Sequence, residues 1–405
     1  MLKEMLDTLQ KLPQRKALKS LDIDVSKPLI AIVTVSSEDS LANNEISVIV
    51  EKVKDGLSQS GAVSKVINCA SREFSTAFGT QISKYELPMR EYYANSVEFV
   101  CASDIYDGIV FVVSQPMAAA GLLIGAVRMN MPCMFVSQGV MSPIEFEGQH
   151  TGYLSMYTEI GELKTGRINH EKMELIENSL PLSLGTDCET YGENSFNCVL
   201  EVMGLSIKNN GSAPAHTVER YKIARATGNA IVEMIKNKLT LKTLLTSQVL
   251  LTATATDLAI GGSATTLLNM LALSKELGLK NLTMDTIEEL AKNTPVLVDC
   301  SDSALSFMEQ FHSAGATYAV LRELEKNQII RCDYTIFNGK SMSSTLKGTV
   351  ITENKIIRSM ISPAYPTSYL RVMRGNLADD GAIAQFHNKI TSFNGTAKIY
   401  TNEES

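Results

Sequence analysis

Four short, mostly apolar segments constrain the fold of this chain more than any other feature of its sequence. They cover residues 28–35, 64–69, 108–113 and 132–137, and the first is a continuous run rich in β-branched residues. A continuous apolar run of this length is typical of a strand that is buried on both faces. Helical patterns separate the runs from one another. The sequence therefore predicts an α/β fold in which a doubly wound parallel sheet carries helices on both faces.

The predicted sheet also indicates where a functional site should lie. Ligands of doubly wound sheets bind beyond the carboxyl ends of the strands, where the chain turns into the next helix. We therefore expect functional side chains in the turns that follow Val35, Cys69, Val113 and Ser137.

The pattern changes along the rest of the chain. Residues 141–184 have weak periodicity and are predicted to form a connection with short helices, and residues 294–300 read as a further buried strand. From about residue 336, Thr- and Ile-rich segments with Gly and Pro between them indicate β-structure. We therefore divide the chain into an α/β domain, 1–335, and a partial β-rich domain, 336–405.

Composition excludes several classes of protein. The net charge of −7 argues against a nucleic-acid partner and against a basic membrane-binding face. No apolar run approaches the length of a membrane span, and the first 20 residues do not resemble a secretion signal, so a cytoplasmic location is expected. The seven cysteines include no CxxC pair, which favours reduced thiols over disulfides or a zinc ribbon.

Residues 185–206 combine a polar turn with an apolar helix. Asn194 or Ser195 can supply the N-cap, and the helix is predicted by apolar residues at helical spacing, namely Phe196, Val199, Leu200 and Met203. The turn before it carries candidate ligand-binding residues: Asp187, Cys188, Glu189 and Tyr191. A solvated loop before a core helix is the alternative. His312 follows a helical run and is either a hydrogen-bonded structural residue or a catalytic one.

Several motifs resemble a known family, in that family's order. They are KYELPMREYYANSVEF, GNAIVEMI, AIGGS, FHSAGATYAVLREL, MRGNLADDGAI and NGTAKIY. The 185–206 stretch adds matches at Tyr191, Asn194, Ser195, Glu201, Gly204, Leu205 and Ser206. On these residues the chain is identified as a divergent member of the dihydroxy-acid dehydratase and phosphogluconate dehydratase family.

The resemblance implies a doubly wound N-terminal domain, a β-barrel-like C-terminal domain and a homodimer. It implies a hydro-lyase that removes water from a 2,3-dihydroxy acid to give a 2-keto acid. It also implies an iron–sulfur cluster held by three cysteines and a nearby Mg²⁺ ion.

The family's metal-binding positions are not retained in this sequence. The three cluster cysteines align with Asn43 or the residue before it, Gln115 and Asp187, and the Asp and Lys after the second cysteine align with Pro116 and Met117. Amide, proline and thioether groups do not replace thiolates or hard oxygen donors. The family's catalytic serine belongs to a C-terminal part that has no counterpart here. We therefore predict that the chain holds neither cofactor.

Three functions remain open. The first is a non-catalytic binding or regulatory subunit, either a homodimer or a hetero-oligomer with a dehydratase homologue. Another is a small-molecule sensor that keeps a carboxylate-binding glycine turn at Gly261, Gly262 and Ser263. The alternative is a dihydroxy-acid or sugar-acid hydro-lyase that a partner chain completes and that depends on Asp187 and Glu189.

Overall fold

The computed structural model of the chain describes residues 9–37, 46–71, 81–102, 105–146, 149–151, 155–179, 183–188, 193–298, 307–349, 355–386, 392 and 394–401. Asn43, Glu189 and Tyr191 lie outside these ranges.

A four-stranded parallel sheet forms at the four predicted runs. Its strands are β1 (Leu29–Ser36), β2 (Val63–Ala70), β3 (Gly108–Val112) and β4 (Cys133–Val136). Their order in the sheet is β2-β1-β3-β4, so the chain moves first to one side of β1 and then to the other. The prediction of a doubly wound parallel sheet is confirmed.

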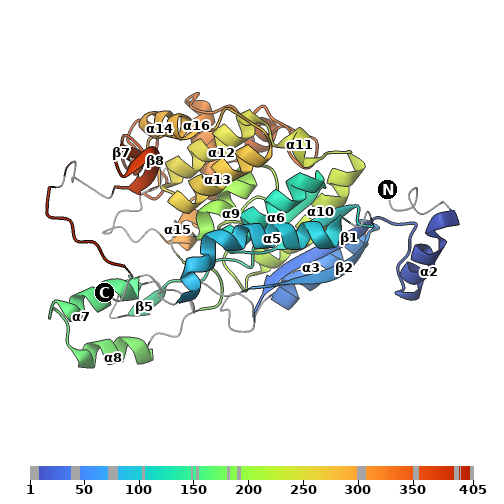
Figure 1. Ribbon diagram of the computed structural model, residues 1–405, viewed down its shortest axis with the longest axis horizontal. Coiled ribbons are helices and arrows are strands. Elements are labelled where there is room, and N and C mark those ends of the chain that lie inside the picture. The colour runs from blue at the N-terminus through green and yellow to red at the C-terminus, as the bar shows by residue number, and fades with distance from the viewer. Residues whose placement is uncertain are drawn as a thin grey trace.

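Helices cover both faces of the sheet because parallel neighbours need right-handed crossovers. The helices α5 (Glu86–Cys101) and α6 (Pro116–Met129) pack together on one face. On the other face α3 (Ile46–Gln59) packs against α10 (Val218–Lys236). Figure 1 shows these layers around the strands.

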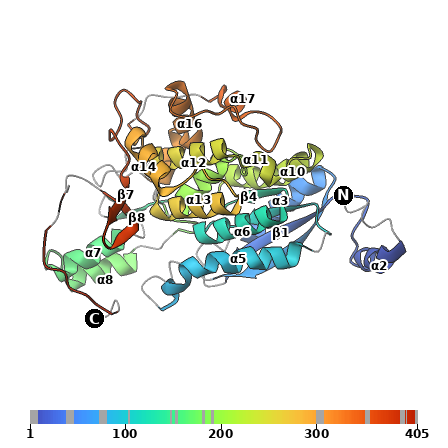
Figure 2. The same ribbon diagram turned by 45° about the horizontal axis from the view of Figure 1, so that its top comes forward.

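A layer of helices extends the core beyond β4. It contains α9 (Glu193–Val202), α12 (Ser247–Ile260), α13 (Ala264–Glu276), α14 (Met284–Asn293) and α16 (Ala316–Lys326). Phe196, Val199, Leu200 and Met203 are all buried, as the helical spacing predicts. A single buried cluster runs from the sheet through these helices to Leu370. Figure 2 shows this layer above the sheet.

Two predictions of β-structure are wrong in detail. Residues 294–298 do not join the sheet; Val296 and Val298 form isolated antiparallel bridges with Tyr365 and Ile357. The segment is apolar because Val296, Leu297 and Val298 are fully buried outside the sheet, and periodicity does not distinguish this situation from a strand inside it. Within the Thr-rich segment after residue 336, Met342–Leu346 forms the helix α17, with Ser341 as its N-cap.

The remaining described elements are short. The connecting region contains a hairpin that the sequence did not predict, β5 (Ile144–Phe146) and β6 (Gln149–Thr151), and the helices α7 (Ser155–Lys164) and α8 (His170–Ser179). The part after residue 336 contributes the hairpin of β7 (Leu370–Gly375) and β8 (Ala378–Gln385). Small elements are η1 (Leu9–Lys11), α2 (Leu12–Ser20), η3 (Gln81–Tyr85), α11 (Leu241–Leu244) and α15 (Met308–Ser313).

The division at residue 335 stays a prediction, although Ile336, Met342 and Leu346 belong to the same buried cluster as the sheet. Within the described ranges, no helix is both long and apolar enough to cross a membrane.

The contact between α3 and α10 gives a stability prediction. A Cβ on Gly228 would lie 2.3 Å from the carbonyl oxygen of Val53, so the two helix backbones approach too closely for any side chain. We expect Gly228→Ala to lower the free energy of unfolding by about 2–3 kcal/mol, as overpacking does. Urea unfolding of both proteins measures the change.

Gly161 provides the matched control. It lies inside α7, and a Cβ there would meet no atom within 4 Å. Alanine is the better helix former by about 1 kcal/mol, so Gly161→Ala should stabilise the protein slightly. If both substitutions changed stability by the same amount, close packing of α3 on α10 would not be the cause.

Candidate functional site

The carboxyl edge of the sheet is built from turns that bond to one another. The hydroxyl of Ser114, which follows β3, accepts a hydrogen bond of 3.0 Å from the amide of Gln138, which follows β4. The carbonyl of Ser114 accepts one of 3.0 Å from the side-chain amide of Asn197 on α9. Helix α9 is therefore attached to the edge at which ligands bind in doubly wound sheets.

The first turn of α9 meets the first turn of α13. The hydroxyl oxygen of Ser195 lies 2.6 Å from that of Thr266 and 3.2 Å from that of Ser263. Ser263 is also the N-cap of α13, since its hydroxyl accepts the amide of Thr266 at 3.1 Å. We call Ser195, Ser263 and Thr266 the hydroxyl cluster. Two helix N-termini, each with a partial positive charge, converge on it.

The conformation of the glycine turn explains why positions 261 and 262 are both glycine. Gly261 ends α12 with φ +75, a left-handed conformation that glycine adopts without strain. Gly262 has another reason to be glycine, because a Cβ there would lie 2.0 Å from a carboxylate oxygen of Asp257. The turn therefore makes room for the side chain of Asp257.

Asp257 is a buried acid that the sequence reasoning missed. It lies in the last turn of α12, and neither carboxylate oxygen has a partner within normal hydrogen-bond limits among the described residues. Burial raises the pKa of Asp257 to about 8, and the neighbouring hydroxyl of Ser195 and amide of Ser263 offset only part of that effect. The only signal in the sequence is an acid inside the apolar run TATATDLAI, directly before the glycine turn.

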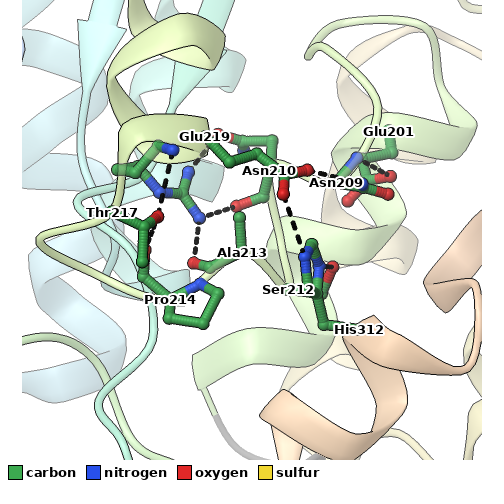
Figure 3. Close-up of polar contacts among 10 residues, drawn as sticks. Glu201, Asn209, Asn210, Ser212, Ala213, Pro214, Thr217, Glu219 and His312 are labelled. Carbon is green, nitrogen blue, oxygen red and sulfur yellow. Dashed lines mark hydrogen bonds and ion pairs between the residues drawn. The ribbon is translucent and has the colours of Figure 1, made fainter.

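A loop between α9 and α10 is fixed by two buried charged side chains (Figure 3). The carboxylate of Glu201 accepts hydrogen bonds of 3.0 and 2.8 Å from the amides of Asn209 and Gly211. The guanidinium of Arg220 donates to the carbonyls of Ser137 at 3.3 Å and Asn210 at 2.9 Å. Burial raises the pKa of Glu201 to about 7 and lowers that of Arg220 to about 10.

The same loop holds His312. Its Nδ1 lies 3.0 Å from the hydroxyl of Ser212, and its Nε2 lies 3.2 Å from a carboxylate oxygen of Glu219 (Figure 3). Ser212 is fully buried. His312 therefore joins α15 to the start of α10, which fits the structural alternative of the two that the sequence left open.

The polar turn before α9 is hydrogen-bonded both to α9 and to the start of α15. The side-chain amide of Asn194 donates to the carbonyl of Asp187 at 2.6 Å, and the carbonyl of Cys188 accepts the amide of Met308 at 2.7 Å. Asn194 and Ser195 lie inside the first helical turn of α9 and do not precede it. Asp187 and the glycine turn are thus both connected to the N-terminus of α9, through Asn194 and Ser195.

The described residues that the resemblance matches to the family's metal ligands lie around the N-terminus of α6 and in the turn before α9. Gln115 is the residue before α6, and its side-chain oxygen accepts the hydroxyl of Ser71 at 3.5 Å. Pro116 and Met117 begin the helix and are buried. These groups do not fit an iron–sulfur cluster or Mg²⁺, since neither thiolate nor hard oxygen is present at either helix position.

The thiols that the structure describes form no disulfide with one another. They are the buried side chains of Cys69, Cys101, Cys133, Cys188, Cys198 and Cys332. Burial raises the pKa of Cys69, and that of Cys101 to about 12, so these two thiols stay protonated at neutral pH. Among the described residues, no three His, Cys, Asp or Glu side chains are grouped as metal ligands.

Comparison with known proteins gives a consistent result. Residues 27–345 match the model of the dihydroxy-acid/6-phosphogluconate dehydratase N-terminal family. The chain is 28% identical over 401 residues to a dihydroxy-acid dehydratase from Pyrococcus furiosus, which covers 98% of this chain and 73% of the relative. It is 30% identical over 398 residues to one from Methanococcus maripaludis, covering 97% of this chain and 72% of the relative.

Asp257 gives a pH-dependent prediction. Its pKa is raised in the folded state, so the folded protein keeps a proton that the unfolded chain loses above about pH 4. The stability that this proton contributes is complete below the unfolded pKa and is lost as the pH rises to about 8. Relative to Asp257→Asn, the unfolding free energy should fall by up to about 1.4 kcal/mol per pH unit across this range.

Urea unfolding of both proteins from pH 4.5 to 8.5 measures that difference. The asparagine variant keeps the shape of the side chain and removes its titration. A difference that stayed constant with pH would show that Asp257 is ionised throughout.

Proposed function

Because the chain belongs to the dihydroxy-acid/6-phosphogluconate dehydratase family, we propose that it keeps the dehydratase scaffold as a non-catalytic binding or regulatory subunit. In this proposal it holds neither an iron–sulfur cluster nor Mg²⁺. Its partner is a second copy or a dehydratase homologue.

The chemistry of the side chains at the positions matched to the family's metal ligands supports this proposal. Gln115, Pro116 and Met117 lie at the start of α6, at the carboxyl edge of the sheet, where the resemblance to the family implies a thiolate and two further metal-site residues. An amide, a ring without an N–H and a thioether provide no charged ligand for iron or for Mg²⁺. Asp187 likewise places a carboxylate where the resemblance implies the third cluster cysteine. The scaffold around these positions is intact, which supports a role in binding.

The N-termini of α9 and α13 supply the proposed ligand site. Their partial positive charges favour an anion, and Ser263 is partly exposed beside them. A small carboxylate is the chemistry that this arrangement fits. Asp187 adjoins the same place through Asn194. The family's reaction suggests 2-keto acids and 2,3-dihydroxy acids as the first ligands to try.

One observation favours the alternative, a hydro-lyase that a partner chain completes. The carboxyl of Asp257 lies at the hydroxyl cluster, and its pKa of about 8 suits a group that exchanges protons at neutral pH. The alternative requires dehydratase activity in a complex with the partner, and that activity should disappear in Asp187→Ala and Glu189→Ala.

Metal analysis tests the proposal directly. We expect protein purified without oxygen to contain less than about one iron atom per ten chains, because the cluster would lack thiolate ligands. It should show no brown absorbance and no activity on 2,3-dihydroxy acids. A family member that keeps the three cysteines, prepared in parallel, is the control for cluster loss. Iron near one cluster per chain would refute the proposal, and activity only with a co-expressed partner would favour the alternative.

Ligand binding is tested by thermal shift with 2-keto and 2,3-dihydroxy acids. A ligand at a hundred times its dissociation constant should stabilise the protein by about 2.7 kcal/mol. Ser263→Ala should abolish most of this shift, and it should cost about 1 kcal/mol of stability through the lost N-cap.

Ser341→Ala is the matched control, because Ser341 caps α17 through the amide of Ser344 in the same way. It should lower stability similarly and leave the ligand shift unchanged. If none of these acids shifted the wild-type transition, a carboxylate site at the glycine turn would be excluded.

A further inference from the structure

The N-terminal helix α2 and the turn before it present exposed apolar and basic side chains, among them Leu9, Leu12, Lys16 and Lys19. It projects beyond the sheet at the end where β1 begins (Figure 1). Leu18 is its buried residue and packs with Ile23 and Leu29. Leu9 is 85% exposed, and Leu12 is exposed beside it. Residues 9–21 contain four basic side chains and no acid: Lys11, Arg15, Lys16 and Lys19.

The outer face of α5 has the complementary character. Tyr92 and Phe99, seven residues apart, lie on one side of this helix, and Tyr85 precedes them by another seven. All three are exposed, Phe99 to 89%. The opposite side, with Tyr93, is buried against α6. We call the exposed side, defined by Tyr85, Tyr92 and Phe99, the α5 face.

Acidic residues border the α5 face. Glu91 and Glu98 are about half-exposed, and α5 carries three acids against one arginine. That arginine, Arg90, donates to Asn269 on α13, at 3.1 Å. Arg128 of α6 contacts both glutamates but also binds Glu276, so it does not cancel the acidic charge. Lys84 is exposed beside Tyr85, so the border is negative along Tyr92 and Phe99 and not at the Tyr85 end.

We propose that α2 of one copy of this chain docks on the α5 face of a second copy, and that the exchange is reciprocal. Leucines meet aromatic rings in the centre of the contact, and lysines face glutamates at its rim. The two-fold repeat doubles the buried area and closes the assembly at two chains.

The same features disfavour docking of α2 on the α5 face of its own chain. Leu18 anchors α2 in the cluster with Ile23 and Leu29, close to Ile105 and Tyr106. Swinging α2 onto its own α5 would expose this cluster, whereas a second copy can accept the arm in the position observed. The inference is independent of whether the chain binds metals, so metal analysis does not bear on it.

Photo-crosslinking tests which chain contributes the arm. Phe99 is replaced by benzoylphenylalanine, and this protein is mixed with an equal amount of isotope-labelled wild-type protein. We expect a crosslinked dimer in which position 99 of the light chain is joined to residues 9–21 of the heavy chain. Crosslinks only within the light chain, or to any other segment, would overturn the proposal.

Light scattering on a size-exclusion column measures the strength of the contact. The double substitution Tyr92→Ser and Phe99→Ser should weaken the dimer by about 30-fold or more, as removal of a central aromatic pair does. Lys16→Glu with Lys19→Glu should weaken it as well, and the wild-type dimer should dissociate more readily at high salt. These side chains are exposed, so the monomer should keep its circular dichroism spectrum.

Ile361→Ser is the matched control, because Ile361 is a fully exposed apolar residue outside both surfaces. It should leave the dimer unchanged. A wild-type protein that stays monomeric at high concentration, or a dimer that the two double substitutions do not weaken, would refute the proposal.

Discussion

The structure depends on a helix that has no side in contact with solvent. Every residue of α9 from Asn194 to Val202 is buried, although four of these residues are polar or charged: Asn194, Ser195, Asn197 and Glu201. A buried polar group costs free energy unless it finds a partner inside the protein. The partners lie on the edge of the sheet, at the glycine turn and in the loop before α10. The hydrogen bonds that the buried polar side chains of α9 need therefore fix the positions of the sheet edge, the glycine turn and the loop before α10.

This dependence is compatible with the proposed loss of the family's metal sites. The bonds from α9 go to backbone groups and hydroxyls, for example Asn197 to Ser114 and Glu201 to Gly211. None of them requires a thiolate or a metal ion. The side chains at Gln115, Pro116 and Met117 start a helix whose own packing is apolar, with Gly121 against the backbone of α5. Changes at the ligand positions thus leave the core contacts in place.

The sequence predicted the parts of the fold that follow from local periodicity. The four strands, the helices between them and the α9 stripe are confirmed, because each buried face repeats with its own period. The segment 294–298 was misassigned since a buried apolar run looks the same outside a sheet as within it. Asp257, and the bonds of His312 to Ser212 and Glu219, depend on residues that meet only in the folded chain. Glu201 and Arg220 were not singled out as a pair for the same reason.

The buried charges also limit what the proposed site can do. Both side chains are fully buried. Glu201 accepts from two amides and the terminal nitrogens of Arg220 donate to carbonyls, so these groups are engaged within the protein, although the Nε of Arg220 has no partner among the described residues. Asp257 differs, because its carboxyl lies at the hydroxyl cluster without a charged partner among the described groups. An anion bound at the two helix N-termini would favour its protonated form, since two nearby negative charges repel. Binding of a carboxylate should therefore be accompanied by proton uptake near pH 8, which separates a ligand at this site from one bound elsewhere on the protein.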